Sequence, residues 1–180
     1  ADDRVVVEGL APVVTGATIE SVRRMGKVVL LDTDRATIGL HFGMTGRLVI
    51  DGFSPIERLT YASGRDDPTW DRLTLDTSPA PSAGQPALRF NDPRRLGRVS
   101  LDPDLSGLGI DFSAVTPRRL AAALAGRRSV LKSALLDQHV VAGLGNLCVD
   151  EVLWWAGLDP RRRVDSLSAD ETGRLASAIR

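Results

Sequence analysis

The spacing of the apolar residues changes once along this sequence of 180 residues, near Thr116. Before that point, short segments rich in β-branched residues are separated by Gly and Asp, a pattern typical of strands joined by turns. After it, apolar residues recur every three or four positions, as they do on one face of a helix. The sequence therefore predicts an α+β protein in which an antiparallel β-sandwich is followed by a helical domain.

The first hundred residues are predicted to contribute strands and loops. The predicted strands cover residues 5–7, 17–24, 27–33, 37–42, 47–51, 70–77, 87–90 and 98–101. Residues 52–69 and 78–86 hold much of the Pro, Ser, Gly and Asp, so we expect loops there. These segments form a predicted sandwich domain over residues 1–104, and residues 102–111 form a predicted linker to the next domain.

Four helices are predicted in the second domain, which covers residues 112–180. They span about 117–125, 129–138, 146–157 and a segment from 169 onward. Thr116 can cap the first helix, with Pro117 at its first position. Ser168 and Glu171 form a capping box at the start of the fourth helix.

Two further features bear on the packing and the completeness of the helical domain. Trp154 and Trp155 stand at helical spacing from Val152 and Leu158, so we expect both tryptophans in the core. The chain ends at Arg180, inside the fourth predicted helix. A domain rarely ends after so few turns of a helix, so the second domain is expected to be incomplete at its C-terminus.

The charge is balanced overall but unevenly distributed. Lys+Arg and Asp+Glu number 23 each, so the formal net charge is +0 and gives no evidence for a nucleic-acid partner. Basic residues nevertheless cluster in residues 23–27, 94–98 and 118–132, and the last of these segments contains no acid. Each cluster alone is explained by a solvated surface. Together with the Gly-rich turn before Asn146, where a helix start can offer N–H groups to an anion, they predict shared phosphate binding.

The single cysteine, Cys148, restricts the chemistry available to the chain. It excludes an internal disulfide and a cysteine-based zinc finger, and it fits a reducing, cytoplasmic setting. No apolar run approaches the roughly 18 residues of a membrane span, and the N-terminus shows no signal-peptide pattern. The sequence has no dinucleotide fingerprint, phosphate-loop signature or metal-ligand spacing. We therefore expect no metal or cofactor, and an enzyme acting on small molecules is disfavoured.

Four motifs occur in an order that resembles one family of DNA-repair proteins. They are RRMGKVVLL at 23–31, HFGMTGRL at 41–48, FNDPRRLG at 90–97 and LLDQHVVAGLGN at 135–146. By these motifs and their spacing, residues 15–180 are similar to the formamidopyrimidine-DNA glycosylase and endonuclease VIII family. The resemblance implies a β-sandwich and a helix–two-turns–helix domain on either side of a DNA groove. It also implies that a damaged base is flipped out of the duplex.

The resemblance assigns a wedge role to three residues. Met44, Arg94 and Leu96 match the side chains that fill the gap left by the flipped base. A flexible apolar side chain, a cation and an apolar wedge can replace the lost stacking. Leu96 stands where many family members carry Phe, so its stacking is expected to be weaker. Without the resemblance, Met44 and Leu96 would be assigned to the core.

The resemblance assigns phosphate-binding or DNA-facing roles to five further residues. Lys27 matches a lysine near the target-site phosphates, and Asn146 matches an asparagine that binds phosphate at a helix start. Arg127 and Lys132 match basic positions that face DNA, and His41 is a candidate phosphate contact. Three of the five have a plain structural alternative: a strand-edge surface lysine for Lys27, an N-cap for Asn146 and a structural histidine for His41.

The catalytic groups of the family have no counterpart in the sequence. Family members use an N-terminal proline followed by glutamate, whereas this chain begins Ala1-Asp2-Asp3. The C-terminal zinc or zincless finger of the family has no counterpart either. We therefore assign no catalytic residue and expect this chain to lack glycosylase activity. It is either the central part of a longer enzyme or a short member that keeps the DNA-gripping surface, and each domain is then incomplete at its outer end.

These observations predict a damaged-DNA-binding protein of base-excision repair, from a family of combined DNA glycosylases and abasic-site lyases. The expected partner is double-stranded DNA with an oxidised base or an abasic site, and no membrane is expected to take part. The alternative is a non-enzymatic adaptor that reuses the scaffold to bind RNA, the ribosome or another protein. The retained wedge residues argue against it, since an adaptor needs no duplex wedge.

Overall fold

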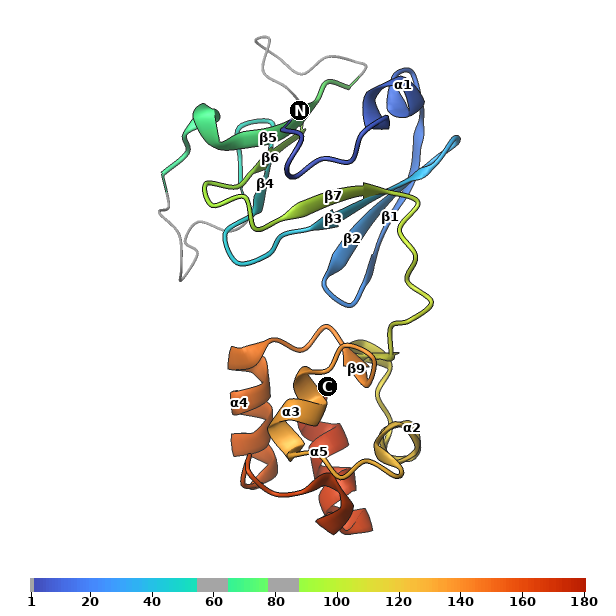
Figure 1. The fold of residues 1–180 in the computed structure, drawn as a ribbon, viewed down its shortest axis with the longest axis vertical. Coiled ribbons are helices and arrows are strands. Elements are labelled where there is room, and N and C mark those ends of the chain that lie inside the picture. Colours follow the sequence, from blue (N-terminus) through green and yellow to red (C-terminus); the bar gives the residue numbers. More distant parts are fainter. Residues whose placement is uncertain (1, 55–64, 78–87) are drawn as a thin grey trace. The chain divides into compact units, whose positions relative to one another are not determined.

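The computed structural model describes residues 2–54, 65–77 and 88–180 (Figure 1). The chain divides into two compact units. The first comprises Ala1–Arg24 and Val28–Pro103, and the second comprises Met25–Lys27 and Asp104–Arg180. The turn at Met25–Lys27 therefore belongs with the second unit, although the chain on either side of it is part of the first. The predicted loops at 52–69 and 78–86 lie largely outside the described residues.

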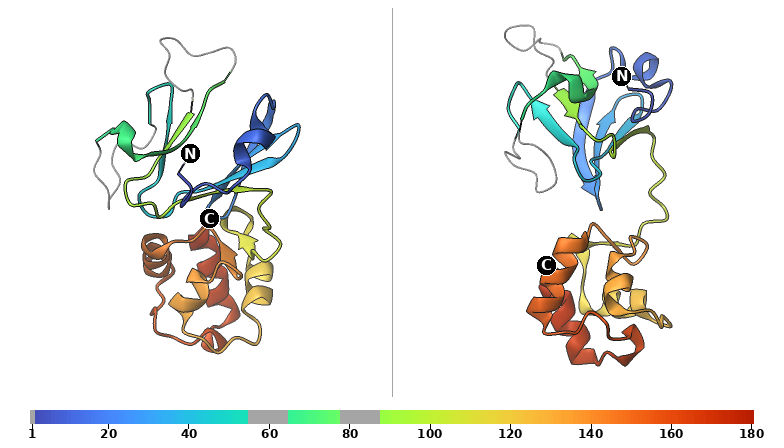
Figure 2. Two further views of the ribbon diagram at one scale, coloured as in Figure 1. Left: turned by 45° about the horizontal axis from the view of Figure 1, so that its top comes forward. Right: turned by 60° about the vertical axis from the view of Figure 1, so that its left-hand side comes forward.

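Two sheets form the first unit (Figures 1 and 2). One contains β1 (Ile19–Met25), β2 (Val28–Thr33), β3 (Thr37–His41) and β7 (Arg98–Leu101) in the order β1-β2-β3-β7. The other contains β4 (Arg47–Ile50), β5 (Asp71–Leu75) and β6 (Leu88–Asn91) in the order β4-β6-β5. Antiparallel registers join β2 to β3, β3 to β7, and β6 to both β4 and β5. Seven of the eight predicted strands are thus confirmed to within a few residues.

Both sheets contribute to one buried core. Leu31, Ile38 and Leu40 reach it from the first sheet, and Leu73 and Phe90 reach it from the second. Full burial of an apolar side chain of this size contributes about 1.5–3 kcal/mol. The shared core confirms the predicted antiparallel sandwich.

The N-terminal segment differs from its prediction. Residues 5–7 form no strand, and they pair with β7 through one parallel bridge between Val6 and Val99. The carbonyl oxygen of Asp2 accepts hydrogen bonds from two amides of this segment, which closes a turn and leaves few extended residues. The segment leads into α1 (Leu10–Val14), a short helix that the sequence does not predict.

Four helices build the second unit, as predicted. They are α2 (Pro117–Leu124), α3 (Leu131–Leu136), α4 (Asn146–Ala156) and α5 (Ala169–Ile179). Their shared core includes the fully buried side chains of Leu120, Leu131, Leu135, Leu153 and Leu175. α3 is shorter at both ends than the predicted 129–138, because Val130 and Asp137 have extended backbone conformations. Within the described part of the chain, no helix is long and apolar enough to cross a membrane.

The second unit also contains a parallel strand pair that the sequence does not predict. β8 (Ile110–Asp111) pairs with β9 (Val141–Ala142). β8 falls in the predicted linker and β9 in the Gly-rich turn, and two residues per strand are too few to leave a periodic signal. The 3-10 helices η1 (Pro68–Trp70), η3 (Phe112–Ala114) and η4 (Val164–Ser166) lie between the larger elements.

The predicted caps are present at the starts of α2 and α5. Thr116 Oγ1 accepts a hydrogen bond from the Arg119 amide, and Pro117 is the first residue of α2. At α5, the Glu171 amide donates to Ser168 Oγ at 3.2 Å, and the Ser168 amide donates to Glu171 Oε2 at 2.9 Å. The capping box is thus confirmed, and it satisfies N–H groups that have no acceptor inside the helix.

The capping carboxylate of Glu171 is expected to make stability depend on pH. Hydrogen bonds from Arg162, and then from the Ser168 amide, lower the pKa of Glu171 from 4.5 to about 2. A carboxylate with a lowered pKa stabilises the fold above its ordinary pKa, and this contribution is lost as the pH falls through the folded-state value. We therefore expect protonation of Glu171 to lower the melting temperature between about pH 4.5 and about pH 2.

Glu171→Gln isolates this contribution from the other carboxylates. Glutamine can still accept the hydrogen bond from the Ser168 amide, but it does not titrate. Melting temperatures measured over the same pH range should fall less steeply for the variant than for the wild-type chain. Parallel curves for the two proteins would contradict the assignment.

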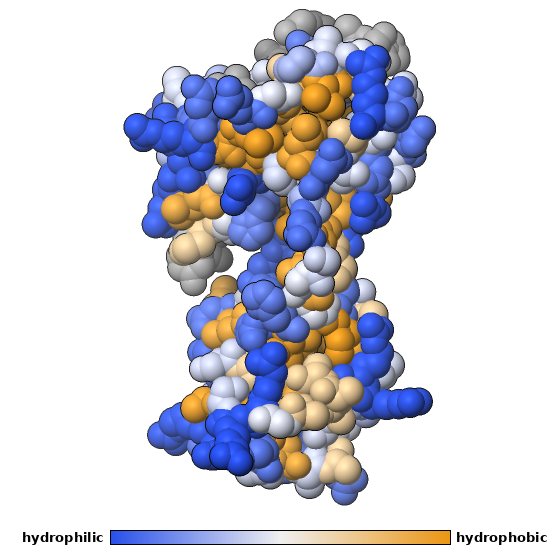
Figure 3. All heavy atoms as spheres, turned by 45° about the vertical axis from the view of Figure 1, so that its right-hand side comes forward, coloured by the Kyte–Doolittle hydropathy of each residue, from blue (hydrophilic) through white to orange (hydrophobic). Residues whose placement is uncertain are grey.

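Two tryptophans of α4 lie on the surface, so the prediction that they belong to the core is wrong. Trp154 is 82% exposed and Trp155 is 78% exposed. Val149, Val152 and Leu153 occupy the core-facing side of α4. Successive residues of a helix are rotated by about 100°, so the two residues after Leu153 turn away from that side. Figure 3 shows that apolar side chains reach the surface of both units among hydrophilic ones.

Candidate nucleic-acid interface

Two loops of the first unit carry the three predicted wedge residues. One loop joins β3 to β4 and holds Met44, and the other joins β6 to β7 and holds Arg94 and Leu96 (Figure 1). All three residues are exposed, with Met44 at 51% and Leu96 at 44%. The structural alternative for Met44 and Leu96, a place in the core, is therefore wrong.

The backbones of these two wedge loops lie in close contact. Gly43 has a φ of +59°, and a Cβ at this position would lie 2.4 Å from the carbonyl oxygen of Leu96. Glycine alone allows both this conformation and this approach. A Cβ on Gly97 would lie 2.9 Å from the carbonyl oxygen of His41. The glycines of the two motifs thus bring the loops that carry the wedge residues into contact.

A turn at Arg95 separates the two wedge residues of the second loop. Arg95 has a φ of +55°, which is uncommon for a residue with a Cβ. Its Nε donates to Asp2 Oδ2 at 2.7 Å, and Arg72 Nη1 donates to the same oxygen at 3.2 Å. The Arg95 hydrogen bond is the largest cause of a lowered pKa of the Asp2 carboxyl. Arg95 is thus held by Asp2, whereas the described residues include no ion-pair partner for Arg94.

His41 lies at the end of β3 and supports the first wedge loop. Its Nδ1 accepts a hydrogen bond from the Gly43 amide at 3.2 Å. The residue is partly buried. This contact supports a structural role for His41, and a role in binding phosphate stays a prediction.

The turn at Met25–Lys27 is packed on the strand pair of the second unit. The Gly26 amide donates to Asp111 Oδ2 at 2.8 Å. A Cβ on Gly26 would lie 3.1 Å from the Cβ of Ala142. These contacts hold the turn against β8 and β9, and they fix the backbone from which the exposed Lys27 side chain extends.

The first turn of α4 has the features of an anion site. Its N-cap is Gly145, and no side chain within the described chain caps it. Asn146 is the first helical residue, so the structural alternative for it, a plain N-cap, is wrong. The first N–H groups of a helix lack intrahelical acceptors and attract anions. Lys27 Nζ lies 4.0 Å from the position that a Cβ would take on Gly145, so the second unit brings Lys27 to the start of α4.

Acids from later in the chain pair with Arg127 and Lys132. Arg127 Nη1 donates to Asp137 Oδ2 at 3.0 Å, and Lys132 Nζ lies 2.6 Å from Asp150 Oδ1. The segment 118–132, which contains no acid of its own, therefore gains acidic partners through folding. Partly exposed ion pairs of this kind contribute only about 0–1 kcal/mol, so a phosphate can compete with either carboxylate.

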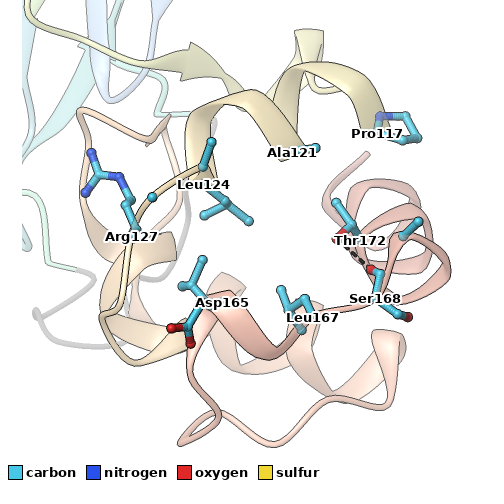
Figure 4. A pocket seen from close by; sticks show the side chains of 12 residues that line it. Pro117, Ala121, Leu124, Arg127, Asp165, Leu167, Ser168 and Thr172 are labelled. Carbon is cyan, nitrogen blue, oxygen red and sulfur yellow. Dashed lines mark hydrogen bonds between the residues drawn. The ribbon is translucent and has the colours of Figure 1, made fainter.

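A cavity of about 470 Å³ lies between α2, η4 and the start of α5 (Figure 4). Much of its wall is apolar and includes Leu124 and Leu167. Thr172 Oγ1 donates to the carbonyl oxygen of Ser168 at 2.9 Å on the α5 side. Among the residues that line the cavity, Arg127 is the one predicted site residue. The cavity therefore does not coincide with the wedge loops or with the start of α4.

The residues that position the predicted site residues have no distinctive pattern in the sequence. Thr45 and Asp92 hold the wedge loops, and Asp111 holds the turn that bears Lys27. In the sequence, each of these three residues is only a polar residue close to a glycine. That pattern does not show which groups the side chain will bind. Of the residues that the structure describes, no group of three or more His, Cys, Asp or Glu could hold a metal ion.

Comparisons with known proteins agree with this geometry. The family model for the formamidopyrimidine-DNA glycosylase N-terminal domain matches residues 2–99. The model for the formamidopyrimidine-DNA glycosylase H2TH domain matches residues 107–180. A formamidopyrimidine-DNA glycosylase from Paracoccus denitrificans is 39% identical over 183 residues, which cover 95% of this chain and 62% of the relative. The chain thus spans about 62% of the length of a relative that it matches.

Solved structures share the α+β architecture. The crystal structure of the MutM (Fpg) protein from Thermus thermophilus is 30% identical, with a TM-score of 0.73 over 91% of this chain and 58% of that chain. The structure of Lactococcus lactis Fpg, non-covalently bound to DNA that contains an AP site, is 25% identical. Its TM-score is 0.70 over 91% of this chain and 61% of that chain.

Proposed function

Because this chain belongs to the formamidopyrimidine-DNA glycosylase family, we propose that it binds damaged double-stranded DNA in base-excision repair. The proposed damage is an oxidised base or an abasic site. The observation that carries this proposal is that two loops in close contact expose Met44, Arg94 and Leu96. A flexible apolar chain, a guanidinium and a branched apolar chain suit insertion into a duplex from which one base is missing or flipped.

The proposal gives different tasks to two surfaces. The wedge residues of the first unit distinguish damaged from intact DNA, because they replace lost stacking. In the second unit, Lys27 and Asn146 at the start of α4 bind phosphate, and so provide affinity that is common to all duplexes. Arg127 and Lys132 add to this second set once DNA phosphates displace their carboxylate partners. His41 supports its loop and stays a candidate phosphate contact.

For a whole protein that contains this chain, the proposed reaction is cleavage of the N-glycosidic bond of an oxidised base, followed by strand cleavage at the abasic site. The name of the relative, formamidopyrimidine-DNA glycosylase, supports this reaction. We assign no catalytic step to the described residues. The proposed compartment is the cytoplasm, which the single cysteine, Cys148, supports.

An adaptor for RNA, the ribosome or a protein partner is the alternative function. An adaptor has no need of an exposed duplex wedge, whereas a reader of damage requires one. Equal affinity for intact duplex, damaged duplex and structured RNA would support the adaptor and contradict the proposal.

Met44→Ala is expected to reduce the preference for damaged DNA while affinity for intact DNA changes little. Losing the burial of a methionine side chain costs about 1.5–3 kcal/mol, which corresponds to about tenfold or more in affinity. The relevant quantity is the ratio of the dissociation constants for an intact duplex and for the same duplex with an abasic-site analogue. Fluorescence anisotropy titrations with labelled duplexes measure both constants.

Ile50→Ala provides a matched control for Met44→Ala. Ile50 is also an exposed apolar residue of the first unit, but it lies on β4, outside both wedge loops. Its replacement should leave the ratio of dissociation constants unchanged. An unchanged ratio in Met44→Ala, or the same change in both variants, would contradict the wedge assignment.

A further inference from the structure

One carboxylate is bound to both wedge loops. Asp92, at the start of the second loop, is completely buried, with 0% exposed. Its Oδ2 accepts a hydrogen bond from the Gly97 amide at 2.7 Å, and its Oδ1 accepts one from the Arg94 amide at 3.3 Å. Its Oδ1 also accepts a hydrogen bond from the hydroxyl of Thr45 in the first loop. The carboxylate thus contacts the residue after Met44 in one loop, and residues on either side of the Arg95 turn in the other.

The cost of burying the Asp92 carboxylate makes the stability of each wedge loop depend on the other loop. The partners just described are one hydroxyl and two amides. Burial of an ionised carboxylate is costly unless hydrogen bonds compensate it, and the loss of one donor leaves the charge under-compensated. Thr45 is itself completely buried, so water cannot readily replace its hydroxyl. A change in the first loop should therefore destabilise the second.

The backbone of Asp92 is anchored to the sandwich. Its amide donates to the carbonyl oxygen of Trp70 at 2.9 Å, and its carbonyl oxygen accepts a hydrogen bond from Arg72 Nε at 2.8 Å. Trp70 ends η1, the 3-10 helix just before β5, and Arg72 lies on β5, an edge strand of the second sheet. The close approach of Gly43 to the carbonyl oxygen of Leu96 adds a direct contact between the loops. Asp92 thus connects both loops to η1 and β5 of the sandwich.

We propose that Asp92 is a positioning residue that couples the two loops, so that Met44, Arg94 and Leu96 form one preorganised wedge. The inference rests on the proposed function, because it concerns the same wedge. Side chains and loops that are ordered before binding lose less conformational entropy when the partner binds. Asp92 acts through its hydrogen-bond donors and makes no contact with DNA itself.

Thr45→Val tests the coupling from the loop that does not contain Asp92. Valine keeps the branched shape of threonine and removes the hydroxyl. We expect the amides of residues 94–97 to exchange with deuterium about tenfold faster, because a hydrogen bond to a charged group contributes about that factor. The preference for the abasic duplex should fall by a similar factor. The dependence of affinity on salt, which the proposed function assigns to the phosphate-binding residues of the second unit, should stay unchanged.

Thr45→Ser is the matched control, because serine keeps the hydroxyl and should keep both wild-type values. If the valine variant does not fold, Thr45→Ala removes the same hydroxyl without placing a methyl group against the carboxylate. Unchanged exchange at 94–97 in the variant without the hydroxyl would overturn the inference, and so would an equal loss of protection in the serine variant. The exchange measurement needs no DNA. It therefore decides about Asp92 even if the wild-type chain shows no preference for the abasic duplex, a result that would instead refute the proposed function.

Discussion

Lys27→Ala is expected to weaken binding to intact and damaged duplexes by about tenfold each, the value of one charge-assisted phosphate contact. Lys27 Nζ lies 4.0 Å from the Cβ position of Gly145, beside a helix start without a side-chain cap. A cation and a helix N-terminus both favour a phosphate there. Because each neutralised phosphate releases counterions, the slope of log K against log salt should decrease by about 0.9. Titrations of both duplexes at several salt concentrations measure affinity and slope together.

Two further variants serve as controls for Lys27→Ala. Lys27→Arg keeps the positive charge and should keep most of the salt dependence. Lys132→Ala removes another lysine of the second unit, whose Nζ lies 2.6 Å from Asp150. Its ion pair has to break before it can bind phosphate, so we expect a smaller loss. A change in the preference for damaged DNA, without loss of affinity for intact DNA, would refute the phosphate role of Lys27.

Leu135→Ala is expected to lower the free energy of unfolding of the second unit by about 2–5 kcal/mol. Leu135 is fully buried in the core of this unit, so truncation leaves a cavity that neighbouring side chains fill only in part. The loss is large against the total of about 5–15 kcal/mol that is typical of a domain. Urea unfolding followed by the helical circular dichroism signal measures it, because α2 to α5 all lie in this unit.

Leu147→Ala is the matched control for Leu135→Ala. It removes the same atoms from α4, but the Leu147 side chain is exposed. Surface substitutions of this kind usually change stability by no more than about 0.5 kcal/mol. Equal losses in the two variants would show that burial of Leu135 does not stabilise the unit as described.

Most of the fold could be predicted because local patterns determine it. Thr116 and Ser168 mark the starts of α2 and α5 through hydrogen bonds to residues three positions later. The pairing of Ile110–Asp111 with Val141–Ala142 could not be predicted, since it joins distant segments through two residues each. The exposure of Trp154 could not be predicted either, because it depends on which face of α4 the rest of the core covers.

The candidate site could be predicted only in part, because motifs identify positions but not partners. Met44 and Arg94 are exposed on contacting loops, and Lys27 lies beside a helix start. No local pattern relates Arg127 to Asp137, so its ion pair emerges only from the fold. The hydrogen bond between Asp92 and Thr45 of the other wedge loop could not be predicted for the same reason. The DNA-binding roles of these residues stay predictions until binding is measured.

The most direct test of the proposed function is equilibrium binding of this chain to a labelled duplex that contains a stable abasic-site analogue. The same duplex without the analogue is the reference, and both are measured at two salt concentrations. We predict tighter binding to the abasic duplex, and a steep loss of affinity for both duplexes as the salt concentration rises. Equal binding to the two duplexes, or no detectable binding to either, would contradict the proposal that this chain reads DNA damage.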